Sequence, residues 1–198
     1  MAKNVFFSFH YEDVISFRAN VVRNHDTVNG KQAGYFDKSI WEDAKKTSTL
    51  ALKRLINNNL DGTSVTCVLI GSQTYARTWV IYEIFRSIYK GNKIIGVHIN
   101  RIKGKDGLIK SNGPNPFDFT GVYFNEDGSS YAFITRSSHT SQWKFWEEID
   151  SCRFFRNQYF TSQYAYSNRG KCISLSSFLM TYDWISDNGY TNFKNWIL

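Results

Sequence analysis

Three short apolar runs without polar alternation stand out along the chain. They cover residues 3–9, 66–70 and 93–99, and polar residues close each of them. Strands that are apolar on both sides are typical of a parallel sheet covered by helices on both faces. The pattern therefore predicts three buried strands, and residues 34–36 predict a further short one.

Apolar residues at helical spacing fill the segments between these runs. The spacing predicts one helix over residues 12–24, with Phe17 on its apolar side. A second helix is expected to end in the three asparagines at 57–59, before the Asp61-Gly62 turn. Both helices would pack on the sheet through their apolar sides.

The third predicted helix has the clearest ends. Its apolar residues run from Trp79 to Ile88, with Thr78 as the expected N-cap and Gly91 just past the end. Alternating strands and helices predict an α/β fold with a doubly wound parallel sheet. Ligands of such sheets bind at the carboxyl ends of the strands. The residues expected on that rim are Ser8, Phe9, Asp37 and Ser72.

The pattern changes after residue 99. A loop rich in Gly, Lys and Asn leads to a predicted hairpin, with strands at 122–124 and 131–135. The segment 182–198 has the spacing of a short amphipathic helix. We therefore expect a core over residues 1–118 and an aromatic-rich elaboration, hairpin plus helix, over 119–198 that packs on the sheet and completes the same domain.

Composition and charge narrow the class of protein. The 198 residues carry 24 basic and 17 acidic side chains, a net charge of +7 that is spread along the chain rather than clustered. This spread argues against a nucleic-acid binder. The first apolar run is too short for a signal peptide or a membrane span, so a cytoplasmic chain without membrane contact is expected. The scattered cysteines and histidines predict no metal site.

Sequence motifs exclude two common enzyme classes. The chain has neither a P-loop nor the three-glycine fingerprint of dinucleotide-binding folds, and it lacks a Gly-x-Ser-x-Gly nucleophile elbow. A hydride-transferring enzyme is therefore not expected. Any chemistry must come from the polar residues near the strand ends.

Several blocks of residues carry a resemblance to a known family. Residues 5–13 resemble the opening strand and loop of Toll/interleukin receptor (TIR) domains, and Tyr35-Phe36-Asp37 resembles their second strand. Residues 67–72, followed by Trp79 and Glu83, resemble the third strand and the Trp-x-x-x-Glu helix. Segments including 18–24, 40–46 and 182–184 are most similar to the TIR-like ThsB family of the bacterial Thoeris antiphage system.

This resemblance implies a TIR/flavodoxin-like fold and an enzyme. Members of the family cleave NAD at the nicotinamide glycosidic bond and cyclise the remainder to an isomer of cyclic ADP-ribose. The resemblance implies that NAD would be the substrate, and it implies no other cofactor. By the same resemblance, the product would be a diffusible signal to a partner effector with a sirtuin-like domain, and a phage protein would be a candidate trigger.

The resemblance also assigns roles to residues. Glu83 would be the catalytic residue, since nicotinamide in NAD is already cationic and its bond can break without a general acid through an oxocarbenium-like transition state. A carboxylate there stabilises the developing positive charge. The candidate substrate-binding residues are Phe7, Ser8, Phe9, His10, Asp37, Trp41, Ser72 and Trp79. The loop over residues 38–46 is expected to close over a folded-back substrate.

Each assignment has a simpler alternative. Spacing alone favours an exposed Glu83 that pairs with Arg86. Trp41 could stack on a substrate ring or anchor a core, whereas the position of Trp79 in its helix favours packing beneath that helix. For the whole chain, the alternatives are a non-catalytic TIR-like interaction module and a basic nucleic-acid-binding domain.

Overall fold

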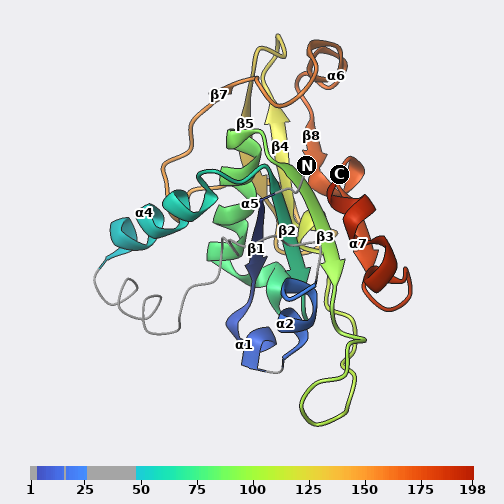
Figure 1. The fold of residues 1–198 in the computed structure, drawn as a ribbon. Helices are drawn as coiled ribbons and strands as arrows, with labels where there is room; N and C mark the ends of the chain where they lie inside the picture. The colour runs from blue at the N-terminus through green and yellow to red at the C-terminus, as the bar shows by residue number, and fades with distance from the viewer. Residues whose placement is uncertain (1–3, 16, 26–47) are drawn as a thin grey trace.

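The protein is described here by a computed structural model that covers residues 4–15, 17–25 and 48–198. Figure 1 shows a central parallel sheet with helices around it and a second sheet at one end. The expected strand at 34–36 lies outside the described residues, as do Asp37, Trp41 and the loop 38–46. The strands are β1 (Val5–Phe9), β2 (Val65–Ile70), β3 (Lys93–His98), β4 (Thr120–Phe124), β5 (Ser130–Thr135), β6 (Lys144–Phe145), β7 (Phe155–Arg156), β8 (Cys172–Ser174) and β9 (Met180–Asp183).

The central sheet confirms the α/β interpretation. Its described strands run parallel in the order β1-β2-β3-β9. Every residue of β2 is buried, as two-sided hydrophobicity requires. The three strands predicted from the apolar runs are confirmed within a few residues at each end.

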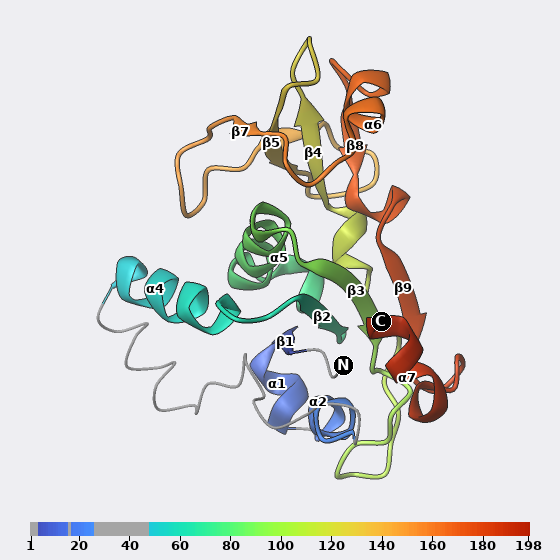
Figure 2. The same ribbon diagram turned by 45° about the horizontal axis from the view of Figure 1, so that its top comes forward.

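Helices cover both faces of this sheet (Figure 2). One core cluster joins Phe6 and Val68 to α4 (Thr49–Leu60) and α5 (Thr78–Lys90), and the other joins Phe7 and Cys67 to α2 (Arg18–Arg23) and α7 (Gly189–Ile197). Neighbouring strand residues thus face different helices, because side chains alternate across a strand. The helices are α1 (Tyr11–Ile15), α2 (Arg18–Arg23), α4 (Thr49–Leu60), α5 (Thr78–Lys90), α6 (Ser162–Ser167) and α7 (Gly189–Ile197).

The helix predicted over residues 12–24 is wrong in one respect, because the chain breaks it into α1 and α2. Phe17 adopts the left-handed conformation, with φ at 65°, and is 46% exposed. A left-handed residue cannot continue a right-handed helix. The break turns Phe17 outward and places Arg18 in the interior instead, where it is 1% exposed.

The ends of α4 and α5 follow the sequence signals closely. Ser48 caps α4 by accepting a hydrogen bond from the Ala51 amide, and α4 ends at Leu60 before the turn at Asp61-Gly62. Gly91 ends α5 with φ at 79°, a conformation that glycine adopts without steric cost. The N-cap of α5 is Arg77 rather than Thr78, so that prediction was wrong by one residue.

The C-terminal part contains more strands than its sequence pattern predicts. The hairpin is confirmed as β4 and β5, but β6, β7 and β8 extend it into a five-stranded sheet. Tyr182 and Asp183, expected in a helix, lie in β9 and pair with Val97 and His98 of β3. The helix itself begins later, as α7. Residues beyond 118 therefore contribute an edge strand to the central sheet.

Arg18 attaches the loop after β3 to the core. Its Nε donates to the Ile102 carbonyl at 2.9 Å and its Nη2 to the Leu108 carbonyl at 2.7 Å. Hydrogen bonds from a charged donor are stronger than neutral ones. This one side chain therefore fixes the loop against the amino-terminal helices.

We predict that Arg18→Met destabilises the protein by about 1–3 kcal/mol, because the substitution leaves partly buried carbonyls unsatisfied. Urea unfolding measures the change. Arg54→Met on the exposed side of α4 is the matched control, and surface substitutions of this kind usually stay within about 0.5 kcal/mol. Equal losses in the two variants would contradict this role of Arg18.

Candidate functional site

Alternation along β1 decides which of its side chains can meet α5. Phe6 belongs to the core cluster that contains α4 and α5, whereas Phe7 belongs to the cluster that contains α2 and α7. Ser8 follows Phe7 and therefore faces the same side as Phe6. Near the carboxyl end of β1, a hydroxyl group points at α5.

Glu83 accepts a hydrogen bond from that hydroxyl. The Ser8 Oγ donates to Glu83 Oε2 at 2.5 Å, and both side chains are buried. One turn further along α5, Ser87 Oγ lies 2.7 Å from Thr66 Oγ1 of β2. Two polar contacts thus fix which side of α5 faces the sheet.

Burial changes the acidity of Glu83. Loss of hydration raises its pKa to about 8, and the hydrogen bond from Ser8 acts in the opposite direction because it favours the ionised form. In the protein without substrate, the carboxyl group is therefore largely protonated at neutral pH. Strongly shifted acids of this kind cluster at functional sites.

The alternative of an exposed Glu83 paired with Arg86 is wrong. Glu83 is 6% exposed. Arg86 extends elsewhere and donates from Nε to Asn57 Oδ1 of α4 at 2.9 Å. The carboxyl group is directed at the sheet rather than at solvent.

The structure does not bring every predicted site residue to Glu83. The Phe7 ring stacks on Phe193 of α7 with centroids 6.3 Å apart, and the Arg23 guanidinium lies 5.4 Å from the centre of the Phe9 ring. Both rings lie on the face of the sheet opposite Ser8. Any role of Phe7 or Phe9 toward substrate stays a prediction.

Trp79 lies one turn before Glu83 on α5. Its ring meets Tyr82 edge-on at 5.7 Å and packs against the α4–α5 core cluster while remaining half-buried. The packing matches the simpler alternative for this residue. A contact between Trp79 and substrate remains a prediction.

His10 and Ser72 are half-buried residues just past the carboxyl ends of β1 and β2. His10 Nδ1 lies 3.9 Å from Glu12 Oε2. Burial and the nearby Arg77 lower the His10 pKa, and Glu12 partly opposes them. His10 therefore lies on the predicted rim as a neutral ring at physiological pH, able to donate or accept a hydrogen bond.

Asp13 is a buried rim residue that the sequence pattern did not single out. It is 4% exposed, and a Cβ added to Gly71 would overlap its carboxyl group. Burial raises the pKa of Asp13 to about 6 although Lys110 and Arg18 oppose the shift. The glycine directly after a buried strand was the available signal, since such a position permits close approach of another group.

The described residues contain neither a metal-binding cluster nor a membrane-spanning helix. No three His, Cys, Asp or Glu side chains in residues 4–15, 17–25 and 48–198 gather as a metal site would require. Within the same ranges, no helix combines the length and apolar character needed to cross a membrane.

The parallel sheet, with a buried glutamate of a Trp-x-x-x-Glu helix held against its first strand, defines a TIR-like domain. The family described as "Thoeris protein ThsB, TIR-like domain" matches residues 6–103. A protein of Bacillus cereus (strain MSX-D12), named "Putative cyclic ADP-D-ribose synthase ThsB1", is 55% identical over the full length of both chains. This chain belongs to the ThsB family of TIR-like Thoeris proteins.

We predict that the free energy of unfolding falls as pH rises from about 4.5 to about 8. The folded-state pKa of Glu83 is raised above its ordinary value of 4.5, so the stability is fully present below the lower value and is lost as Glu83 ionises. Glu83→Gln should remove the part of this slope between about pH 6 and about 8, whereas the raised pKa of Asp13 leaves a slope below about pH 6. The variant should also exceed the parent in stability at pH 9. Urea unfolding across pH measures it, with Glu126→Gln in the exposed β4–β5 turn as control. An unchanged slope in Glu83→Gln would contradict the assignment.

Proposed function

We propose that this protein cleaves NAD at the nicotinamide glycosidic bond and cyclises the ADP-ribose part into a cyclic ADP-ribose isomer. The observation that carries the proposal is the buried Glu83, hydrogen-bonded to Ser8 at the sheet edge where α/β folds bind ligands. The name of the Bacillus cereus relative supports the reaction class. NAD serves as substrate, and no further cofactor is required.

Glu83 would act on charge rather than as a proton donor to the leaving group. Nicotinamide leaves as a neutral ring, so the positive charge passes to the ribose as the bond breaks. An ionised carboxylate beside that ribose stabilises the transition state more than the ground state, which is the condition for catalysis. Bound cationic NAD would itself favour this ionised form, because a nearby opposite charge lowers the pKa of an acid.

Ser8 would orient the carboxylate for this task. Its hydroxyl binds Oε2 and not Oε1, so one oxygen is fixed while the other can meet a ribose hydroxyl. The same hydrogen bond favours the ionised form. Ser8 would therefore serve Glu83 and would not itself need to touch the substrate.

Cyclisation requires that a group of the adenosine half reach the ribose carbon before water does. A buried carboxylate suits that requirement, because exclusion of water strengthens electrostatic interactions and suppresses hydrolysis. We propose hydrolysis to linear ADP-ribose as a side reaction of the same site. The cyclic product would activate a partner effector with a sirtuin-like NAD-consuming domain, and a phage protein would be the trigger.

Glu83→Gln should lower NAD conversion by about a hundredfold or more, in line with the loss of one transition-state contact. Mass analysis of nucleotides from phage-infected cells that carry parent or variant measures the product. Glu126→Gln in the exposed β4–β5 turn is the matched control and should keep parental activity. Equal product from Glu83→Gln and parent would refute the catalytic role, and no product from either would favour an interaction module.

Ser8→Ala should shift the pH profile of NAD cleavage to higher pH. The profile of kcat/KM reports the pKa of the free enzyme, so the parent rate should rise with pH up to about 8, where Glu83 ionises. Without the Ser8 hydrogen bond the ionised form is less favoured and the rise moves upward. Thr66→Val, which removes the neighbouring hydroxyl pair with Ser87, should leave the profile in place. A parental profile in Ser8→Ala would contradict the role of Ser8.

A further inference from the structure

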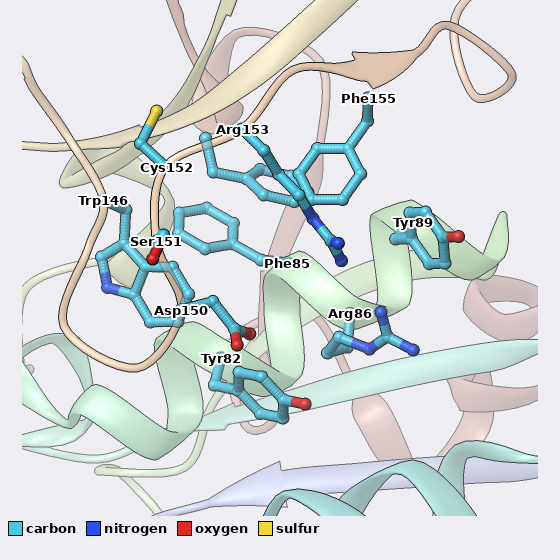
Figure 3. Close-up of a pocket in the computed structure, with 11 residues that line it drawn as sticks. Tyr82, Phe85, Arg86, Tyr89, Trp146, Asp150, Ser151, Cys152, Arg153 and Phe155 are labelled. Carbon is cyan, nitrogen blue, oxygen red and sulfur yellow. The ribbon is translucent and has the colours of Figure 1, made fainter.

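A pocket lies on the outer face of α5, on the side of the helix away from β1. Figure 3 shows its walls, made by α5 on one side and by β5 and the segment 146–155 on the other. Glu83 is not among its lining residues. The pocket is therefore a separate feature from the candidate active site.

The floor of the pocket is aromatic and closed. Phe85 stacks on Phe133 with centroids 4.2 Å apart and meets Trp146 edge-on at 5.2 Å. All three side chains are less than a tenth exposed. This floor gives the pocket a low-dielectric wall, beside which a charge interaction is stronger than in open water.

Two guanidinium groups lie at the open side of the pocket. Arg86 extends over the Tyr89 ring at 4.7 Å, and Arg153 lies over Phe155 at 4.9 Å. Figure 3 shows both guanidinium groups on the Tyr89 side of the pocket. Neither arginine forms an ion pair with a described residue.

The carboxylate in this pocket is already engaged. Asp150 forms an ion pair with Lys53 of α4, and Figure 3 places its carboxylate near Tyr82. Arg86 uses Nε for Asn57, which leaves its two Nη groups without a hydrogen bond to any described residue. Two positive groups thus line one wall, and both have N–H donors that are not hydrogen-bonded to described residues. Each guanidinium can bind two oxygens of one oxyanion at once.

The size of the pocket limits what can enter. Its volume is about 30 Å³, and one water needs roughly 10–15 Å³ on the same measure. A compact oxyanion fits, whereas a whole nucleotide does not. Tyr89 at the mouth is 47% exposed, so its ring could stack a base that stays outside.

We propose that this pocket binds a phosphate group between Arg86 and Arg153, over the aromatic floor of Phe85 and Trp146. The phosphate would offset the repulsion between two cations that line the same pocket and satisfy their open donors. Either free inorganic phosphate or the phosphate of a nucleotide supplies the same chemistry. The site is independent of the reaction at Glu83.

Arg153→Gln tests the proposal, because Arg153 is exposed and its guanidinium packs on the Phe155 ring at the surface. Calorimetric titration of the full chain with inorganic phosphate at low ionic strength should show binding that weakens on the order of tenfold or more in the variant. Arg153→Lys keeps the charge but loses the two-pronged geometry and should fall between them.

Arg169→Gln is the matched control. Arg169 lies over the Tyr166 ring at 4.1 Å with the same three-residue spacing as Arg86 and Tyr89, but it lines no part of this pocket. The Arg169→Gln variant should bind phosphate like the parent. Equal weakening in Arg153→Gln and Arg169→Gln would mean unspecific attraction to a basic protein and would overturn the proposal, as would absence of phosphate and AMP binding to the parent at millimolar concentration.

Titration with AMP separates the two sources of the phosphate. If the natural ligand is a nucleotide, AMP should bind more tightly than inorganic phosphate, and Tyr89→Ala should weaken AMP without affecting phosphate. If the ligand is the free ion, the two should bind alike and Tyr89→Ala should change neither. An AMP affinity that ignores Arg153→Gln would count against the site.

Discussion

The hydrogen bond between Ser8 and Glu83 is the interaction on which the arrangement of the site depends. It joins a carboxyl group that is 6% exposed to a fully buried hydroxyl, across the contact between α5 and β1. Removing an acid from water costs several kcal/mol unless it stays protonated or finds partners. Here the pKa rises to about 8. The fold thus tolerates a buried Glu83 whose pKa lies close enough to neutral pH that a bound cation can ionise it.

The two faces of α5 make different kinds of contact. Glu83 and Ser87 form polar contacts with the sheet, whereas Phe85 packs under the second sheet against Phe133. Because 3.6 residues make one turn, residues 83 and 85 point in nearly opposite directions. The second sheet therefore has a structural consequence for the site: by covering the outer face, it fixes the rotation of α5 and so keeps Glu83 against β1.

Local patterns predicted local structure well and failed where distant contacts decide. The apolar run 93–99 and the glycine at 91 are sufficient signals, because burial and a left-handed cap act over a few residues. The break at Phe17 follows from Arg18 reaching the carbonyls of Ile102 and Leu108, more than eighty residues away. Tyr182 pairs with Val97 of β3, which is also more than eighty residues away along the chain. Neither event leaves a periodic mark in the sequence.

Some residues of the candidate site could likewise be predicted from the sequence, and others could not. Glu83 could be found only through the resemblance of its motif, since an acid on an amphipathic helix is usually solvated. Its partner could have been found by counting alternate residues, because Phe6 and Ser8 must share a face that Phe7 cannot reach. Asp13 was missed, because the signal for it lies at Gly71, almost sixty residues further along the chain, and not beside Asp13 itself. Long-range contacts of this kind position buried acids. Sequence patterns therefore predict the strand ends that carry the site, but not the buried acidic groups beside them.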